Sequence, residues 1–205
     1  ALGGWYGPTL YNQRVILHGL KGKYMGVIGG KPPHMMEDEE RKKSVKIDDM
    51  FIDIGAKNRE EVEYLGIEVG TPVTVDREFT ELAYNRVSGK AFDNRAGVAM
   101  LIKALKEMDS PLTVYGVFTV QEEVGLKGAR TSAYSLDPDC AIATDVTIPG
   151  DHPGIEMKDA PVEMGKGPVI TLVDSSGRGL IASRKVVKWL KDTADIQGIP
   201  VQLEV

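Results

Sequence analysis

The sequence has little of what identifies several large classes of protein. It has one cysteine, Cys140, so no disulfide can form within the chain, which fits a reducing compartment. No apolar run approaches the roughly 20 residues that a membrane-spanning helix needs. The opening ALGGWYG has neither the charged start nor the apolar centre of a signal peptide. We therefore expect a soluble cytoplasmic protein without a membrane partner, in which Cys140 is an inert core thiol.

Basic residues are also too few and too scattered to bind a nucleic acid. The chain has 25 Lys and Arg against 30 Asp and Glu, a formal net charge of −5. The most charged run, MEDEERKKSVKIDD, carries both signs, as solvated loops do. The absence of a basic stripe argues against a nucleic-acid partner.

Residues 1–85 contain short strand-like runs separated by turn residues. These runs are QRVILHG, YMGVIGG, MFIDIGA and TPVTVD. One short helix interrupts them, since Asn58 with Glu61 three residues later predicts a helix cap before EEVEYLG. This pattern predicts a small β-rich, barrel-like domain over residues 1–85.

Residues 86–205 alternate between helical and strand patterns. The predicted helices are NRAGVAMLIKALKEM, GLKGARTSAYS and ASRKVVKWLKDTADIQ, and the predicted strands are LTVYGVFTV, CAIAT, PVITLVD and VQLEV. Near-continuous apolar strands suit a sheet that is covered on both faces. The expected fold is therefore α/β, a layered and largely parallel sheet with helices on both faces.

Four acidic residues of this second half follow predicted strands or begin a predicted helix. They are Asp93, Glu122, Glu123 and Asp145. In an open α/β sheet, ligands bind beyond the carboxyl ends of the strands, so these side chains are candidates to meet there. Each also has a simpler explanation, as a helix cap, a turn residue or a charge near a helix N-terminus. A group of uncompensated carboxylates is costly, however, and a divalent metal would compensate it.

The pair Glu122-Glu123 suits a division of labour at such a metal site. Successive side chains on extended backbone point in opposite directions, so one glutamate can bind metal while its neighbour acts as a base. The three histidines, His18, His34 and His152, are expected to be structural or surface residues and not ligands.

Three motifs then carry a family resemblance. AFDNRAG, TVQEEVGLKGAR and ATDVT, in that order, resemble the tetrahedral (TET) metallo-aminopeptidases, some of whose relatives have been labelled endoglucanases. GVIGGKPPHM, ERKK and MFIDIGAKNREEVEYLGI resemble the inserted dimerisation domain of that family. The resemblance implies a dimerisation domain over 1–85 and an incomplete zinc-peptidase-like catalytic domain over 86–205.

The resemblance also implies roles for the acidic residues. Asp93 corresponds to the carboxylate that bridges two metal ions, Glu123 to a ligand of one ion and Asp145 to a ligand of the other. Glu122 corresponds to the general base. The implied cofactors are two divalent ions, zinc or cobalt, the implied substrates are peptides, and the implied assembly is a dodecamer built from dimers. The family's two histidine ligands lie in segments that would precede and follow residues 1–205, so this chain by itself is expected to be inactive.

Two alternatives stay open. A carboxylate glycoside hydrolase of the endoglucanase kind needs two carboxyl groups about 5–9.5 Å apart across a sugar, which adjacent glutamates do not naturally provide. Such an enzyme would survive a metal chelator, whereas a metallo-aminopeptidase would not. The second alternative is that the chain is not an enzyme but an inactive subunit that serves in assembly.

Overall fold

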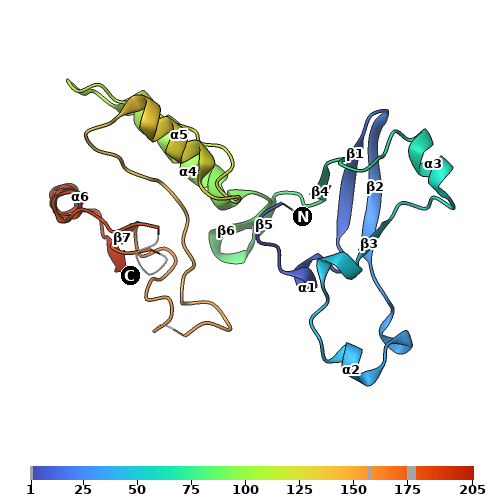
Figure 1. The fold of residues 1–205 in the computed structure, drawn as a ribbon. Helices are drawn as coiled ribbons and strands as arrows, with labels where there is room; N and C mark the ends of the chain where they lie inside the picture. The colour runs from blue at the N-terminus through green and yellow to red at the C-terminus, as the bar shows by residue number, and fades with distance from the viewer. Residues whose placement is uncertain (1, 157, 175–178) are drawn as a thin grey trace. The chain divides into compact units, whose positions relative to one another are not determined.

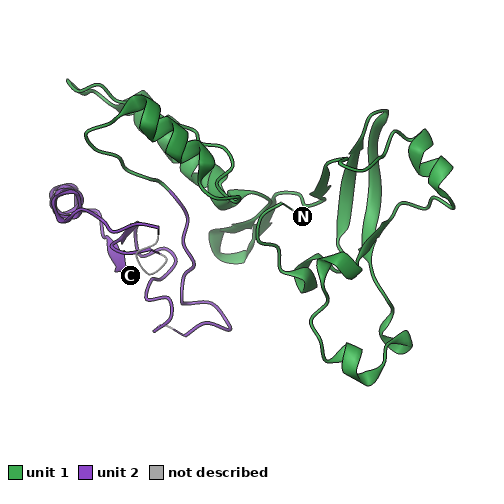
Figure 2. Ribbon diagram, viewed as in Figure 1, with its two compact units in different colours: residues 1–144 green, residues 145–205 purple. Residues whose placement is uncertain are grey.

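The structure, a computed structural model, describes residues 2–156, 158–174 and 179–205. The chain separates into two compact units, residues 1–144 and 145–205, which are coloured separately in Figure 2. Each unit is described by itself. The expected boundary between residues 85 and 86 stays a prediction.

The first unit begins with a four-stranded antiparallel sheet. Its spatial order is β3-β2-β1-β4 (Figure 1), formed by β1 (Arg14–Gly19), β2 (Gly22–Gly29), β3 (Phe51–Asp53) and β4 (Val73–Val75). Three of these four strands lie within runs predicted from the sequence, and β2 begins two residues before the predicted run YMGVIGG, so the four strands are confirmed with one earlier start. The barrel-like closure of this domain stays a prediction, because β3 and β4 at the two edges of the sheet do not pair with each other.

One face of this sheet carries the apolar core of the unit. Val15 and Leu17 of β1 and Ile28 of β2 are buried, and Leu10 and Ile67 cover them from outside the sheet. Burying an aliphatic side chain of this size contributes about 1.5–3 kcal/mol. The alternation of side chains sends Met25 and Val27 to the opposite face, where they are half-exposed. The sheet therefore has one packed face and one open face, as antiparallel sheets commonly do.

The helix α3 (Arg59–Tyr64) has the capping interactions expected from its sequence. The Asn58 Oδ1 atom accepts a hydrogen bond of 2.9 Å from the Glu61 backbone N–H. The Glu61 carboxylate accepts one of 2.7 Å from the backbone N–H of Lys57. The first bond satisfies an amide group that the first turn of a helix leaves without a partner, and the second ties the residue before the cap to the helix.

Short elements complete the first half of this unit. They are α1 (Gly7–Leu10), the 3-10 helices η1 (Pro33–Met35), η2 (Ile47–Asp49) and η3 (Ala83–Asn85), the helix α2 (Asp38–Arg41), and the hairpin of β5 (Thr80–Leu82) and β6 (Arg86–Ser88).

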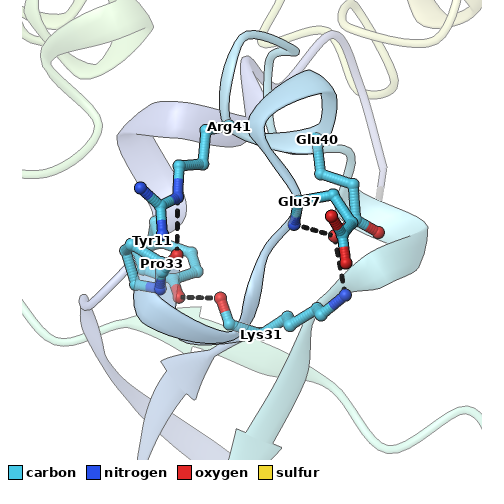
Figure 3. Close-up of polar contacts among 6 residues, drawn as sticks. All are labelled: Tyr11, Lys31, Pro33, Glu37, Glu40 and Arg41. Atoms are coloured by element: carbon cyan, nitrogen blue, oxygen red, sulfur yellow. Dashed lines mark hydrogen bonds and ion pairs between the residues drawn. The ribbon is translucent and has the colours of Figure 1, made fainter.

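A network of polar contacts braces the charged loop between β2 and β3 (Figure 3). The Lys31 ammonium lies 2.6 Å from Glu40 Oε2, and the same carboxylate oxygen accepts a 3.0 Å hydrogen bond from the Glu37 backbone N–H. The Arg41 Nε–H donates to the Pro33 carbonyl at 2.8 Å. The bond from Lys31, followed by that from Glu37, holds the pKa of the Glu40 carboxyl group below its usual range. These contacts give the predicted solvated loop a local structure.

We predict that this brace weakens in acid. A depressed pKa in the folded state means that the Glu40 carboxylate stabilises the loop above the usual carboxylate range and loses that effect as the pH falls through its lowered pKa. The chemical shift of the Glu37 amide, followed by NMR as the pH is lowered, should report the pH midpoint at which Glu40 is protonated. Lys31→Met should raise that midpoint, because it removes the main cause of the lowered pKa. Lys42→Met, which removes the neighbouring Lys42–Glu39 pair, is the control. A midpoint that does not respond to Lys31→Met would contradict the prediction.

The rest of the first unit holds two longer helices. These are α4 (Phe92–Glu107) and α5 (Lys127–Leu136), and both lie where the sequence predicts them (Figure 1). The strands predicted at LTVYGVFTV (residues 112–120) and CAIAT (residues 140–144) are not formed in the structure. No described residue pairs with either segment as a neighbouring strand. A strand needs such a partner for its backbone N–H and C=O groups. Cys140 is consequently exposed, which corrects its prediction as a core thiol.

Among its described residues, the second unit contains a parallel strand pair joined through a helix. β7 (Val169–Thr171) pairs with β8 (Gln202–Glu204), and α6 (Arg184–Gln197) lies between them in the chain. Parallel strands need a crossover connection of this kind. The helix and both strands were predicted, and the parallel direction agrees with the expected sheet. Helices and strands of both units make the fold α/β, while the complete layered sheet stays a prediction.

A membrane span was not expected from the sequence. Within the part of the chain that the structure describes, no helix is both long enough and apolar enough to cross a bilayer.

Candidate functional site

Asp93 lies in an irregular turn at the start of α4. The backbone angles of Asp93 and Asn94 are not helical, so the regular helix begins after them. Ala91, two residues earlier, has a left-handed φ of 63°, which a residue with a Cβ adopts at some cost in energy. The Asp93 side chain is exposed. Asp93 is therefore an exposed residue that precedes the regular part of the helix.

Glu122 and Glu123 are held by a tight connection into α5. The carbonyls of Val120, Gln121 and Glu122 accept hydrogen bonds of 3.0, 3.2 and 3.0 Å from the N–H groups of Gly128, Lys127 and Leu126, respectively. Three successive carbonyls are thus bonded to the beginning of one helix.

Backbone strain accompanies this connection. Gln121 and Leu126 have left-handed φ values of 58° and 55°, so non-glycine residues in this rare conformation stand on each side of the glutamate pair. Such strain costs about 1–3 kcal/mol per residue and is found preferentially at functional sites. The geometry supports a functional role for the pair beyond a charge at a helix end.

Asp145 is the first residue of the second unit and is exposed. Its Oδ1 atom accepts a 2.8 Å hydrogen bond from the backbone N–H of Val146. An Asx-turn has a bond to the backbone two residues on, whereas this one goes to the next residue, so the explanation of Asp145 as a turn residue stays a prediction. The bond leaves the second carboxylate oxygen for another interaction.

The structure brings some of the predicted residues into one unit but does not assemble a metal centre. Asp93, Glu122 and Glu123 belong to the first unit and Asp145 to the second. Residues 2–156, 158–174 and 179–205 contain no group of three or more His, Cys, Asp or Glu side chains arranged to hold a metal ion. The meeting of the four carboxylates therefore stays a prediction.

The chemistry of the donor set nevertheless fits a divalent cation. Asp93, Glu123 and Asp145 are exposed carboxylates, and none forms an ion pair with Lys, Arg or His among the described residues. Carboxylate oxygens of this kind bind zinc at about 2.0–2.2 Å.

The three histidines lie at separate places in the chain, and their expected role as non-ligands stays a prediction. The His18 Nε2 atom is 2.9 Å from the Thr74 hydroxyl, between β1 and β4. The His152 Nδ1 atom is 2.9 Å from the Pro153 carbonyl oxygen, and His34 is an exposed residue of η1. None of the three belongs to a metal-binding group within the described residues.

Sequence reasoning passed over one residue of this region, Asn94. Its Oδ1 atom accepts a 2.8 Å hydrogen bond from the Gly97 N–H, and its Nδ2 group donates a 2.7 Å bond to the carbonyl of Thr144. The sequence carried a weak signal for the first bond, because asparagine is a preferred helix cap. The second bond spans 50 positions and has no signature in a single sequence.

We predict that Gly128→Ala disturbs the glutamate connection. A Cβ at this position would lie 2.5 Å from both the N and the O atom of Val120, and backbone atoms cannot move aside as a flexible side chain can. Crowding of this kind typically costs about 1–3 kcal/mol of unfolding free energy. Chemical denaturation measures the cost.

The matched control is Gly4→Ala, since a Cβ on Gly4 meets nothing within 4 Å. Its effect should stay within about 0.5 kcal/mol. Equal stability of Gly128→Ala and the wild type would refute the tight backbone approach.

Comparisons with known proteins cover the whole chain. The sequence profile of the M42 glutamyl aminopeptidases matches residues 1–205. The putative aminopeptidase FrvX of Escherichia coli (strain K12) is 40% identical over 203 residues, which cover 98% of this chain and 56% of FrvX. The chain thus spans little more than half the length of such relatives.

Solved structures agree with these matches. A TET aminopeptidase from the marine sediment archaeon Thaumarchaeota archaeon SCGC AB-539-E09 is similar, with a TM-score of 0.91 and 42% identity over 98% of this chain and 57% of that protein. The TET1 peptidase of Pyrococcus horikoshii gives a TM-score of 0.79 and 35% identity over 100% of this chain and 60% of its own. That peptidase is described as able to assemble into a tetrahedron or a large octahedral shell.

Proposed function

The chain belongs to the M42 glutamyl aminopeptidase family, and from this membership we propose that the protein is a metal-dependent aminopeptidase that removes N-terminal residues from peptides. The match over residues 1–205 is the observation that carries the proposal. The carboxylates of Asp93, Glu123 and Asp145, which form no ion pair among the described residues, support it because they are suitable oxygen donors for metal ions. We place this activity in the cytoplasm, consistent with the single cysteine.

The proposed roles follow the order of the residues along the chain. Asp93 would contact both of two divalent ions, zinc or cobalt, while Glu123 would bind one and Asp145 the other. Bound ions would polarise the scissile carbonyl and acidify the attacking water. The remaining ligands would come from parts of the full-length relatives that residues 1–205 do not match, so residues 1–205 alone are expected to lack turnover.

Glu122 is proposed as the general base. A carboxylate oxygen of Glu122 would accept the proton of the attacking water and then deliver it to the nitrogen of the leaving amine. Its neighbour Glu123 would stay with the metal. The hydrogen bonds from α5 to the carbonyls of residues 120–122 would hold this base in place.

We predict that Glu122→Gln in the full-length protein lowers turnover by about 10²–10⁴-fold, the usual cost of losing a general base. The neutral amide has nearly the same shape but cannot accept the proton. Zinc content should remain near that of the wild type, as measured by elemental analysis beside a peptide-hydrolysis assay. Glu123→Gln is the matched comparison and should lose metal. The opposite pattern, with metal lost in Glu122→Gln and kept in Glu123→Gln, would exchange the two roles.

Self-association is the second part of the proposal. We assign it to the β-rich first half, as a dodecamer built from dimers, and the assemblies described for the Pyrococcus horikoshii peptidase support it. The open face of the four-stranded sheet exposes 51% of Met25 and 42% of Val27, and Met35 in the braced loop is 65% exposed. Interfaces between subunits are enriched in such uncharged, apolar residues, methionine among them.

We predict that Met25→Glu combined with Val27→Glu yields a smaller species in light scattering of the full-length protein. Two carboxylates would have to lose water within an apolar interface, which disfavours association. Leu20→Glu, at an exposed turn beyond β1, is the control and should keep the mass. An unchanged mass in the double variant would exclude this face as the contact.

A further inference from the structure

The Asn94 side chain joins two segments that are far apart in the sequence. Its Nδ2 group donates to the Thr144 carbonyl at 2.7 Å, while its Oδ1 atom accepts from the Gly97 N–H at 2.8 Å. The orientation of the amide follows from these partners, since only the oxygen can accept from an N–H and only the nitrogen can donate to a carbonyl. Both ends of one planar group are therefore fixed.

The first of these bonds is a helix cap. Because Asn94 is not helical and α4 becomes regular after it, Gly97 is the third residue of the regular helix, the position whose N–H a cap residue normally satisfies. Gly97 is buried, and a Cβ on it would collide with the Asn94 side-chain oxygen. The glycine thus leaves the space that the amide occupies.

The second bond is what a cap alone does not explain. Its acceptor is the carbonyl of Thr144, the residue immediately before Asp145. Its donor, Asn94, immediately follows Asp93. The single amide therefore ties together the backbone next to two proposed metal ligands. Partners one step removed from a metal commonly orient its ligands in this way.

We propose that Asn94 is a positioning residue that sets the backbone of Asp93 against the backbone leading to Asp145, so that both carboxylates can reach the metal ions. This inference rests on the proposed metallo-aminopeptidase function. Asn94 touches neither substrate nor metal in this role. It acts through the hydrogen bond to Thr144.

The test uses Asn94→Ser in the full-length protein. Serine is as good a helix cap as asparagine, so the bond to Gly97 can be kept. Its side chain is too short to reach the Thr144 carbonyl as well, and it adds no charge. The metal-free variant should therefore melt close to the wild-type temperature.

Cobalt(II) is the probe. We expect Asn94→Ser to weaken cobalt binding by about 10- to 100-fold, the usual effect of losing a ligand's supporting partner. The visible absorption bands of the bound cobalt should also change in intensity or position, because the ligand geometry changes. A purely structural role would leave these bands as they are.

Asn58→Ser is the matched control, because Asn58 makes the same cap bond to the residue three positions on, Glu61, at 2.9 Å. It should leave cobalt affinity and spectrum unchanged. Gly97→Ala, which would displace the Asn94 amide, is a second route to the same loss should Asn94→Ser not fold.

The outcomes separate the two proposals. A wild-type protein that binds no cobalt would overturn both this inference and the proposed function. A wild-type protein that binds cobalt, together with an Asn94→Ser variant of the same affinity and spectrum, would overturn this inference alone. Cobalt binding that is weakened and spectrally altered in Asn94→Ser but not in Asn58→Ser would support it.

Discussion

The close approach of backbone to backbone at the start of α5 is the constraint on which the acidic region depends. Gly128 can come within hydrogen-bond distance of Val120 only because it has no Cβ. The approach aligns the N–H groups at the start of the helix with three successive carbonyls, so the segment before Glu123 is held without help from a sheet. The left-handed backbone of Gln121 and Leu126 belongs to the same arrangement. A pair of glutamates on an unsupported loop would have no defined direction.

The first half of the chain is held together in a different way. The four-stranded sheet closes its own backbone hydrogen bonds and packs Val15, Leu17 and Ile28 against residues from nearby segments. None of the four acidic residues belongs to this apolar cluster.

In the second half, local interactions are in place while much apolar surface is still exposed. Phe118 and Val120 in the unpaired segment before the glutamates are 48% and 68% exposed, and Ile142 is 54% exposed. Only the β7–β8 pair satisfies a parallel ladder among the described residues. The chain spans 56% of FrvX and 57% of the archaeal TET aminopeptidase.

The local sequence by itself determined, to within a few residues, the helices α3 to α6 and the strands of the four-stranded sheet, but not α1, α2 or the hairpin of β5 and β6. Capping pairs such as Asn58 with Glu61, and the spacing of apolar residues in α4, act within a few residues, so a pattern in one sequence carries them. Whether residues 112–120 and 140–144 are strands was decided by tertiary structure, because a ladder needs a neighbour that the segment does not contain. The bond from Asn94 to Thr144 was decided there too, since the helix cap fixes where the amide points and only the fold places a carbonyl 50 positions away within its reach.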